Sequence, residues 1–395
     1  AGGNDGCAPR GVSRSADGAV FGATSNGGNK EDNTIFEVLK NGSGVLTFKT
    51  IFRFGDKNTK YYGMDPRVPV ADKNGVLYGA AAQGGLYDGG LIYSLTPPTT
   101  SSSKWVFKAL HHFDPANEAA YPGGNSMDLS RTRSLGALLI DSKGNIYGST
   151  QGTSQIQDNY GEIFKLSKPT STNGTWTKSL LHQFKGTTEV DGYGNATGII
   201  FDLSGNIFGA TEYGGSYTYT CGDGNDSRFG CGVLFRLKKP SISSGAWTYS
   251  VVNRFLQDYY DGANPVGSLV RSSTGIIYGV TNRGGSDLLN FDAGSIYKVD
   301  SPASAAPVYR HVANLRTDGG LGYLPRGGLA QDSAGNLYGT ASYGGAYGNG
   351  TLFKLVKTLN SNNIIVWKKQ RLYSFKNVPV GNIAVGDSGE IYGVT

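Results

Sequence analysis

The chain reads Asp332-Ser333-Ala334-Gly335-Asn336-Leu337-Tyr338-Gly339-Thr340 in its last fifth, and this stretch decides the fold because its pattern returns along the whole sequence. The pattern is Gly, any residue, an aliphatic residue, Tyr or Phe, Gly, any residue, and then Thr or Ala. Its copies begin at Gly18, Gly75, Gly144, Gly205, Gly275, Gly335 and Gly389. Their spacing of about 55 to 70 residues is longer than most solenoid repeats and suits the four-stranded blades of a β-propeller.

Each full repeat predicts four short strands, which we call a, b, c and d in chain order. In the sixth repeat, strand b lies within 336–340, strand c within 350–355, and strand d runs from Trp367 to Phe375. Aromatic and β-branched runs bounded by Gly, Asn, Asp and Ser are typical of antiparallel strands joined by tight turns. Because no stretch shows a helical period of useful length, we expect an all-β chain.

The repeats predict a single β-propeller domain over residues 1–395, with seven antiparallel blades of which the last is incomplete. The seventh copy ends at Thr395 after strands a and b, and residues 1–8 are too few to supply its strands c and d. The alternative is six blades with an appended hairpin. Four tryptophans share the repeat position at the start of strand d, and we expect them to pack between blades: Trp105, Trp176, Trp247 and Trp367.

Composition and cysteine use predict a secreted or cell-surface protein. No apolar run approaches the roughly 20 residues of a membrane helix, and the chain opens as a mature secreted protein does after loss of its signal peptide. Cys221 and Cys231 flank a Gly-rich loop between strands b and c of the fourth repeat, so we expect a disulfide there. Cys7 is left over, as a free thiol or as the partner of a residue outside this sequence.

The repeat resembles the Gly-rich tandem repeat of the GloVer family, which occurs in secreted and surface proteins of bacteria. The shared pattern is Tyr-Gly-x-Thr, then Gly-Gly, then Gly-x-(Ile/Val/Leu)-(Phe/Tyr)-(Lys/Arg)-(Leu/Val). It is matched at 147–150, 208–211 and 278–281, and again at 162–166 and 295–299. The third repeat departs from it, with Gly152-Thr153-Ser154 in place of Gly-Gly. The resemblance implies a tandem-repeat architecture and brings no shared active site.

The alternating strand directions predict which loops share a face. The b–c loops and the d–a connections must emerge at one end of the blades, and the a–b turns and c–d loops at the other. The c–d loops are plain Ser, Thr and Pro linkers, as at 96–101 and 168–172. The b–c and d–a loops carry many Tyr, Arg, Asp and Glu side chains. We therefore expect a ligand site in a central basin on the face that carries the b–c and d–a loops.

Tyr, Arg and Asp around a shallow basin suit a saccharide, because aromatic rings stack on the apolar faces of sugars while polar groups bind the hydroxyls. A single site breaks the symmetry of the repeats, so we favour residues without counterparts in most other blades. The candidate catalytic residues are Tyr61, His112, Arg133, Asp258 and Tyr260. The candidate substrate-binding residues are Tyr62, Arg67, Arg131, Tyr193, Tyr259 and Arg326.

Two enzyme classes fit these residues. A polysaccharide lyase acting on uronates needs a cation to neutralise the sugar carboxylate and a Tyr or His to take the proton at C5. Those roles fall to Arg67, Arg131, Arg133 and Arg326, with Tyr61, Tyr260 or His112 as the base. A glycoside hydrolase instead needs two carboxylates across the basin. Its pool is Asp65, Glu118, Glu189, Asp258 and Asp261, although the Asp-Gly pairs at Asp191, Asp261 and Asp318 share one repeat position, which favours a role in turns.

A lectin or adhesion module with repeated sugar pockets is the alternative to an enzyme. It is indicated by the similar loops Tyr213-Gly214-Gly215, Arg283-Gly284-Gly285 and Tyr343-Gly344-Gly345. The net charge of +6 is spread along the chain, so it permits an acidic polysaccharide and argues against a nucleic acid. We expect a monomer that binds a polysaccharide or oligosaccharide, without a cofactor. A structural cation on the propeller axis is compatible with this expectation, and the sequence does not identify which residues would bind it.

Overall fold

The structure is a computed structural model, and it describes residues 7–26, 33–40, 44–54, 64–100, 103–114, 138–150, 160–171, 174–186, 191–196, 198–216, 221, 230–242, 245–257, 261–285, 293–315 and 320–395. Antiparallel β-sheet is the regular structure of these ranges, as predicted, and they contain no helix long and apolar enough to cross a membrane. Apart from its last two residues, the chain divides into two compact units. Unit 1 takes 1–132 and 136–183, and unit 2 takes 133–135 and 184–393.

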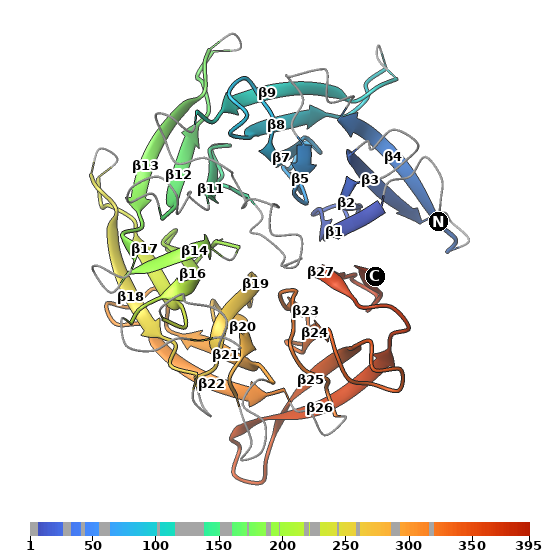
Figure 1. Ribbon diagram of the computed structural model, residues 1–395, viewed down its shortest axis with the longest axis vertical. Helices are drawn as coiled ribbons and strands as arrows, with labels where there is room; N and C mark the ends of the chain where they lie inside the picture. Colours follow the sequence, from blue (N-terminus) through green and yellow to red (C-terminus); the bar gives the residue numbers. More distant parts are fainter. Residues whose placement is uncertain are drawn as a thin grey trace. The chain divides into compact units, whose positions relative to one another are not determined.

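Unit 1 holds three sheets, whose strands follow one another in chain order from the inside outward (Figure 1). The first is β1 (Cys7–Arg14), β2 (Val20–Asn26), β3 (Asn33–Lys40) and β4 (Leu46–Phe54). In the second, β5 (Met64–Pro66) and β6 (Val70–Ala71) both pair with β7 (Leu77–Gln83), and β8 (Leu91–Thr96) and β9 (Val106–His112) follow. The third is β10 (Leu139–Ile140), β11 (Ile146–Thr150), β12 (Glu162–Ser167) and β13 (Thr177–Gln183).

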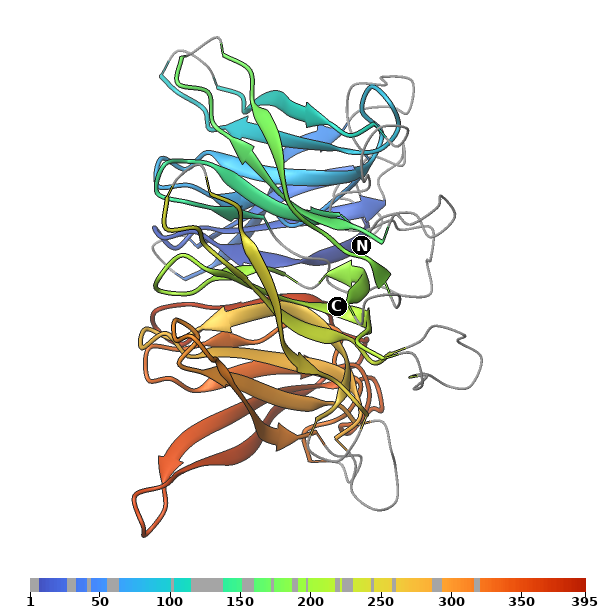
Figure 2. The same ribbon diagram turned by 90° about the vertical axis from the view of Figure 1, so that its left-hand side faces the viewer.

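Unit 2 repeats the same plan three times. Its first sheet has β14 (Gly192–Ala196) and β15 (Ile200–Phe201) on β16 (Ile207–Gly214), then β17 (Val233–Lys238) and β18 (Thr248–Arg254). The next is β19 (Ala263–Arg271), β20 (Ile277–Arg283), β21 (Ser295–Asp300) and β22 (Val308–Asn314). The last is β23 (Ala330–Gln331), β24 (Leu337–Ala341), β25 (Thr351–Leu359) and β26 (Ile365–Ser374), whose long hairpin projects beyond the other strands of the unit (Figure 2). The chain ends with β27 (Val380–Val385) and β28 (Ile391–Val394).

The fold is a β-propeller, and the described residues form six blades, one for each sheet. The count of seven blades is therefore wrong, and the alternative count of six is confirmed. The seventh copy of the sequence pattern forms only β27 and β28, which make no sheet of their own. The physical reason is that an isolated strand pair buries too little apolar surface to stand alone. A single domain over 1–395 stays a prediction.

A glycine in strand b and an aromatic ring in strand c interlock in each of the six sheets. Gly339 lies opposite Phe353, and a Cβ on Gly339 would come within 2.5 Å of Phe353 Cζ. The other pairs are Gly22 with Phe36, Gly79 with Tyr93, Gly148 with Phe164, Gly209 with Phe235 and Gly279 with Tyr297. The ring occupies the space that a side chain would need, which explains why Tyr-Gly-x-Thr and the aromatic-Lys pattern recur together.

The turn between strands a and b is closed by an aspartate. Asp332 Oδ1 accepts a hydrogen bond from the Asn336 backbone N–H at 2.8 Å, and its Oδ2 accepts from Asn336 Nδ2 and from the Tyr338 hydroxyl at 2.8 and 2.9 Å. Asn336 Oδ1 in turn accepts from the backbone N–H of Lys357 at 3.1 Å. Because Asp side chains hydrogen-bond readily to backbone two to four residues on, the Asp-x-x-Gly-Asn sequence specifies this turn.

Aromatic contacts join consecutive blades within each unit, as the shared tryptophan position predicted. The ring centroid of Trp367 lies 6.0 Å from that of Tyr278 in the preceding blade, with the two planes at 85°. Trp176 meets Tyr78, and Trp105 meets Phe21, each with ring centroids 6.3 Å apart. Packing between blades is therefore confirmed for these three tryptophans.

Candidate functional site

The start of strand a and the end of strand b meet at one edge of a blade, which confirms that the d–a and b–c loops share a face. In unit 2, Tyr193 of β14 pairs with Tyr213 of β16, and Tyr323 pairs with Tyr343 in a bridge beside β24. At the same place in the sheet β19–β22, Arg283 lies opposite an alanine. We call these five residues the loop edge of unit 2.

The loop edge contains two stacked tyrosine pairs. The rings of Tyr193 and Tyr213 lie 5.7 Å apart between centroids with their planes at 30°, and those of Tyr323 and Tyr343 lie 5.3 Å apart at 18°. Tyr213 is buried and Tyr193 half-buried, whereas Tyr343 is 37% exposed. Each pair is therefore a stacked aromatic unit that is partly accessible to solvent, through Tyr193 in the first pair and mainly through Tyr343 in the second.

The Gly-Gly pairs after strand b let the two backbone segments of the loop edge approach each other closely. Gly344 has a φ of 88°, and a Cβ on it would lie 2.8 Å from the Cα of Gly322. The adjoining blade is tied in by Asn282, whose Nδ2 donates to the carbonyl of Pro325 at 2.7 Å. Close backbone approach thus sets the spacing at which the tyrosine rings stack.

Arg326, a predicted substrate-binding residue, directly follows Pro325 and is half-buried in unit 2. Two other arginines, Arg10 and Arg67 of unit 1, also follow a proline at the start of strand a. The sequence analysis did not identify these three arginines as equivalent positions of the repeat, although the shared Pro-Arg dipeptide could have shown it.

Arg67 is withdrawn from solvent, with 3% of its surface exposed. Its Nη1 lies 3.1 Å from Asp65 Oδ1, and Arg10 Nη2 lies 2.6 Å from the same oxygen. The Asp65 backbone N–H donates to Asn33 Oδ1 at 3.1 Å. Burial lowers the pKa of Arg67 to about 10 and Arg10 adds to this, while Asp65 opposes it. The Arg67 guanidinium therefore stays charged at neutral pH, while Asp65 joins two blades through Arg10 and Asn33. A role of Arg67 in substrate binding stays a prediction.

His112 lies at the end of β9, where its Nδ1 accepts a hydrogen bond from the backbone N–H of Leu86 at 3.3 Å. Ser374 holds the equivalent place at the end of β26, and its Oγ accepts from the N–H of Ala346 at 3.0 Å. Burial, and secondarily His111, lower the pKa of His112. A neutral ring that accepts at Nδ1 carries its proton on Nε2, so it donates there and is not a base at that atom. Catalysis by His112 stays a prediction.

Seven candidate residues lie outside the described ranges, and their roles stay predictions: Tyr61, Tyr62, Arg131, Arg133, Asp258, Tyr259 and Tyr260. The same holds for Glu118, Glu189 and Asp318. Asp261 is described and serves a turn, since it accepts from Asn253 Nδ2 at 2.7 Å and from the Leu256 N–H at 3.0 Å.

The predicted disulfide between Cys221 and Cys231 is present, with 5.1 Å between the two Cα atoms. Both cysteines are buried in one apolar cluster with Phe255 and Tyr297. The bond therefore anchors the b–c loop that follows Tyr213 to the core of unit 2. Within the described ranges, no group of three or more His, Cys, Asp or Glu side chains is placed to hold a metal ion.

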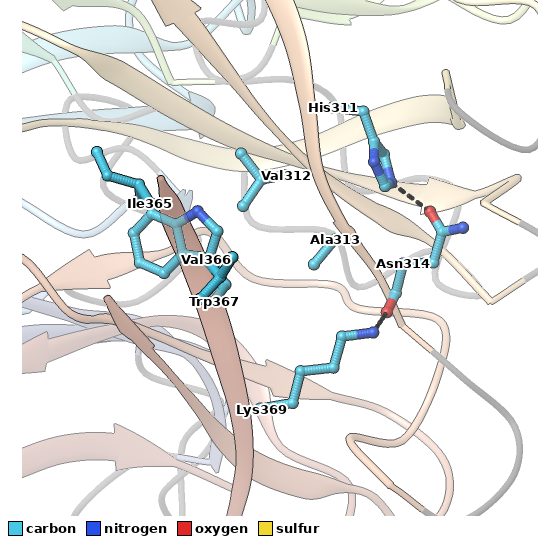
Figure 3. Close-up of a pocket in the computed structure, with 8 residues that line it drawn as sticks. All are labelled: His311, Val312, Ala313, Asn314, Ile365, Val366, Trp367 and Lys369. Carbon is cyan, nitrogen blue, oxygen red and sulfur yellow. Dashed lines mark hydrogen bonds between the residues drawn. The ribbon is translucent and has the colours of Figure 1, made fainter. Parts of the chain in front are cut away.

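A cavity of about 360 Å³ lies between the outer strands β22 and β26 of unit 2 (Figure 3). Trp367, Ile365 and Val366 line it from β26, and His311 and Asn314 line it from β22. The sequence reasoning missed this site, because it assigned Trp367 to packing alone and gave the outer strands no binding role.

The chain resembles a known family in its repeat. Residues 217–395 match the Gloeobacter/Verrucomicrobia repeat. The matched segment contains the loop-edge residues Arg283, Tyr323 and Tyr343, and it confirms the resemblance of the repeat. No curated protein is significantly similar to the chain.

Solved structures show the same fold at low sequence identity. A PL25 ulvan lyase, described as a new family of polysaccharide lyase, aligns with a TM-score of 0.52 at 12% identity, covering 97% of this chain and 87% of its own. The same enzyme bound to a GlcA(1-4)Rha3S saccharide aligns with a TM-score of 0.51 at 12% identity, covering 98% and 89%. A gluconolactonase from Xanthomonas campestris reaches a TM-score of 0.42 at 12% identity, covering 84% and 83%.

Proposed function

We propose that the protein is a secreted, carbohydrate-active β-propeller that degrades an acidic polysaccharide on the face that carries the loop edge. The observation that carries the proposal is the two stacked tyrosine pairs, Tyr193 with Tyr213 and Tyr323 with Tyr343. Aromatic rings suit the apolar faces of pyranose rings, and Arg283 at the equivalent place of the sheet β19–β22 suits a sugar that bears negative charge. The buried disulfide supports an extracellular location.

Cleavage by β-elimination is the reaction that we favour. An arginine pairs with the uronate carboxylate and so acidifies the proton at C5, and a tyrosinate base removes that proton. The electron pair forms the C4=C5 double bond as the C4–O bond breaks, and the leaving oxygen takes up a proton. Arg131, Arg133 and Arg326 are the proposed cations, and Tyr61 or Tyr260 is the proposed base.

One observation favours elimination over hydrolysis. Asp65 and Asp261, the described members of the carboxylate pool, are held by an arginine cluster and by a turn. The likeness to ulvan lyase extends over nearly the whole chain and supports a propeller that can host a lyase, although at 12% identity it reports the fold alone.

A lectin is the second candidate, and a specific observation favours it. The two tyrosine pairs occupy equivalent positions in two blades, as repeated sugar pockets would. A lectin would retain the glycan on several equivalent sites without forming products.

The test is a panel of uronate-containing and neutral polysaccharides incubated with the whole chain. We follow ultraviolet absorbance of the new double bond, reducing ends and retention on immobilised glycan. We expect absorbance to rise with a uronate polymer, and Tyr323→Ala to lower kcat/KM about tenfold or more by removing a stacking surface. Reducing ends without absorbance would indicate a hydrolase, retention without products would indicate a lectin, and no interaction with any glycan would refute the proposal.

A further inference from the structure

Within each unit, one groove between outer strands is closed by two aromatic rings that meet edge to face. Phe54 meets Phe107 in unit 1 and Phe255 meets Tyr309 in unit 2, with centroids 6.1 and 5.9 Å apart and planes at 87° and 82°. The first ring of each pair stands at the end of strand d of one blade, and the second lies within strand d of the next blade. In the groove closed by Phe113, the second position is Lys178, whose Nζ lies 5.3 Å from the centroid of that ring.

The groove between β22 and β26 lacks both rings. Leu315 stands at the first position, as shown by its N–H bonding the Gly294 carbonyl in the way that Phe255 bonds Gly232. Lys369 stands at the second, opposite Leu355 as Tyr309 is opposite Val299. Two smaller or more mobile side chains therefore leave the cavity of about 360 Å³ that Figure 3 shows.

The walls of this groove combine an apolar surface with fixed polar groups. Ile365, Val366, Trp367 and Lys369 line it from β26, and His311 and Asn314 line it from β22 (Figure 3). Asn314 is 7% exposed, and its Oδ1 lies 2.5 Å from His311 Nε2 while its carbonyl accepts from Lys369 Nζ at 2.7 Å. A buried asparagine thus holds an imidazole and an ammonium group at the mouth of an aromatic pocket.

The strands around the groove carry positive charge. Strand β26 contains Lys368, Lys369 and Arg371 and no acidic residue. Strand β25 adds Lys354 and Lys357, again without an acid. The volume lies at the small end of ligand pockets, which fits a single sugar ring better than a larger ligand. Positive potential along the strand would favour a charged polymer over a neutral one.

We propose that this groove is a second saccharide site, which takes one ring of an acidic glycan with its carboxylate or sulfate toward Lys369 and its apolar face on Trp367. It lies on the outer strands of unit 2 and not on the loop edge, so it would hold the polymer without cleaving it. The proposal is independent of whether the loop edge is catalytic.

The test fills the groove as the other blades fill theirs. We compare Lys369→Phe with Lys369→Gln, which keeps the space but removes the charge, and with Lys357→Gln as a control for lost charge elsewhere in the blade. Binding of polygalacturonate, of dextran sulfate and of neutral dextran is measured by isothermal titration calorimetry, and folding by thermal unfolding.

We expect the affinity for the acidic polymers to fall about tenfold or more in both Lys369 variants and less than about twofold in Lys357→Gln, because a charge-assisted hydrogen bond is lost only at the groove. Loss with polygalacturonate alone would assign a carboxylate, and loss with dextran sulfate as well would assign sulfate too. Equal affinity of wild type and Lys369→Phe, or equal binding of dextran, would overturn the proposal.

Discussion

The groove between β18 and β22 and the groove between β22 and β26 share one backbone plan but differ in their contents. In the first, Phe255 lies edge to face with Tyr309 and close to Tyr297, whose centroid is 5.4 Å away. In the second, Leu315 and Lys369 replace Phe255 and Tyr309, and a cavity opens. Two side chains therefore decide whether a boundary between blades is a closed core or a pocket. The repeated sequence keeps the backbone arrangement the same in each blade, and a binding site can arise where the side chains of one copy differ from the others.

The largest expected effect is the loss of stability when Phe255, the ring that closes the groove between β18 and β22, is removed. Phe255→Ala removes a side chain that is 1% exposed, and we expect it to lower the free energy of unfolding by about 3 to 5 kcal/mol. Leu315→Ala at the equivalent place should cost less, about 2 kcal/mol, because fewer buried atoms are lost. Urea unfolding measures both, and a smaller loss for Phe255→Ala would break the comparison.

Both grooves rest on the same interlock of glycine and ring. Gly339→Ala places a Cβ against Phe353, so we expect it to cost about 3 kcal/mol by overpacking. The double variant Gly339→Ala, Phe353→Leu should cost less than the sum of the two single changes, because a smaller side chain relieves the clash. Strict additivity in thermal unfolding would show that the ring does not impose the glycine.

The disulfide belongs to the apolar cluster of the closed groove and not to that of the open one. Changing Cys221 and Cys231 together to alanine should lower the free energy of unfolding by about 2 to 3 kcal/mol through the freed loop. Ligand binding in the open groove should be unchanged. Thermal unfolding with and without a reductant checks the loss, and an unaltered melting temperature would refute it.

Alkaline pH should weaken the closed groove through Tyr297. Burial raises the pKa of Tyr297 far above that of a free tyrosine, so the folded chain keeps a proton that the unfolded chain loses above pH 10 or so. Stability is therefore fully present below about pH 10 and falls above it, by up to about 1.4 kcal/mol per pH unit for this group. Tyr297→Phe should flatten the alkaline limb of a stability profile, and an unchanged limb would contradict this origin.

The smallest effect separates two hydroxyls in the closed groove. The Tyr297 hydroxyl is buried and has no hydrogen-bond partner among the residues that the structure describes, whereas the Tyr309 hydroxyl donates to the Asp261 carbonyl at 3.0 Å. At neutral pH, Tyr297→Phe should raise stability by about 1 kcal/mol and Tyr309→Phe should lower it by about 1 kcal/mol. Chemical denaturation of the two variants gives the signs, and equal signs would refute the assignment.

The repeat made most of the fold predictable, because period-2 strands, turn residues and their spacing are local properties of the sequence. The interlocking residues Gly339 and Phe353 were both visible as motifs, but their contact was not, since register across strands is a tertiary property. The blade count failed for a related reason. A copy of the pattern shows where strands form, and it does not show whether they bury enough surface to make a sheet.

The candidate site was predictable in part. Strand alternation placed Tyr193 and Tyr213 on one face from different loops, and the structure stacks them. Composition could not reveal that Arg67 would be buried against Asp65, because burial depends on what the neighbouring blade places above it. The open groove was not predicted because it depends on the absence of two aromatic rings, at Leu315 and Lys369. These positions correspond to Phe255 and Tyr309 only once the strands of different blades have been aligned by their register.

The interlock of glycine and ring has a consequence for how such chains grow. Both partners lie within one repeat, 14 to 26 residues apart, so a duplicated segment brings its own matching halves. Copying or exchanging a repeat therefore needs no compensating change in the neighbouring copies for this contact to form. Divergence is free to act on the surfaces between copies, where a single exchange such as phenylalanine to leucine creates new space.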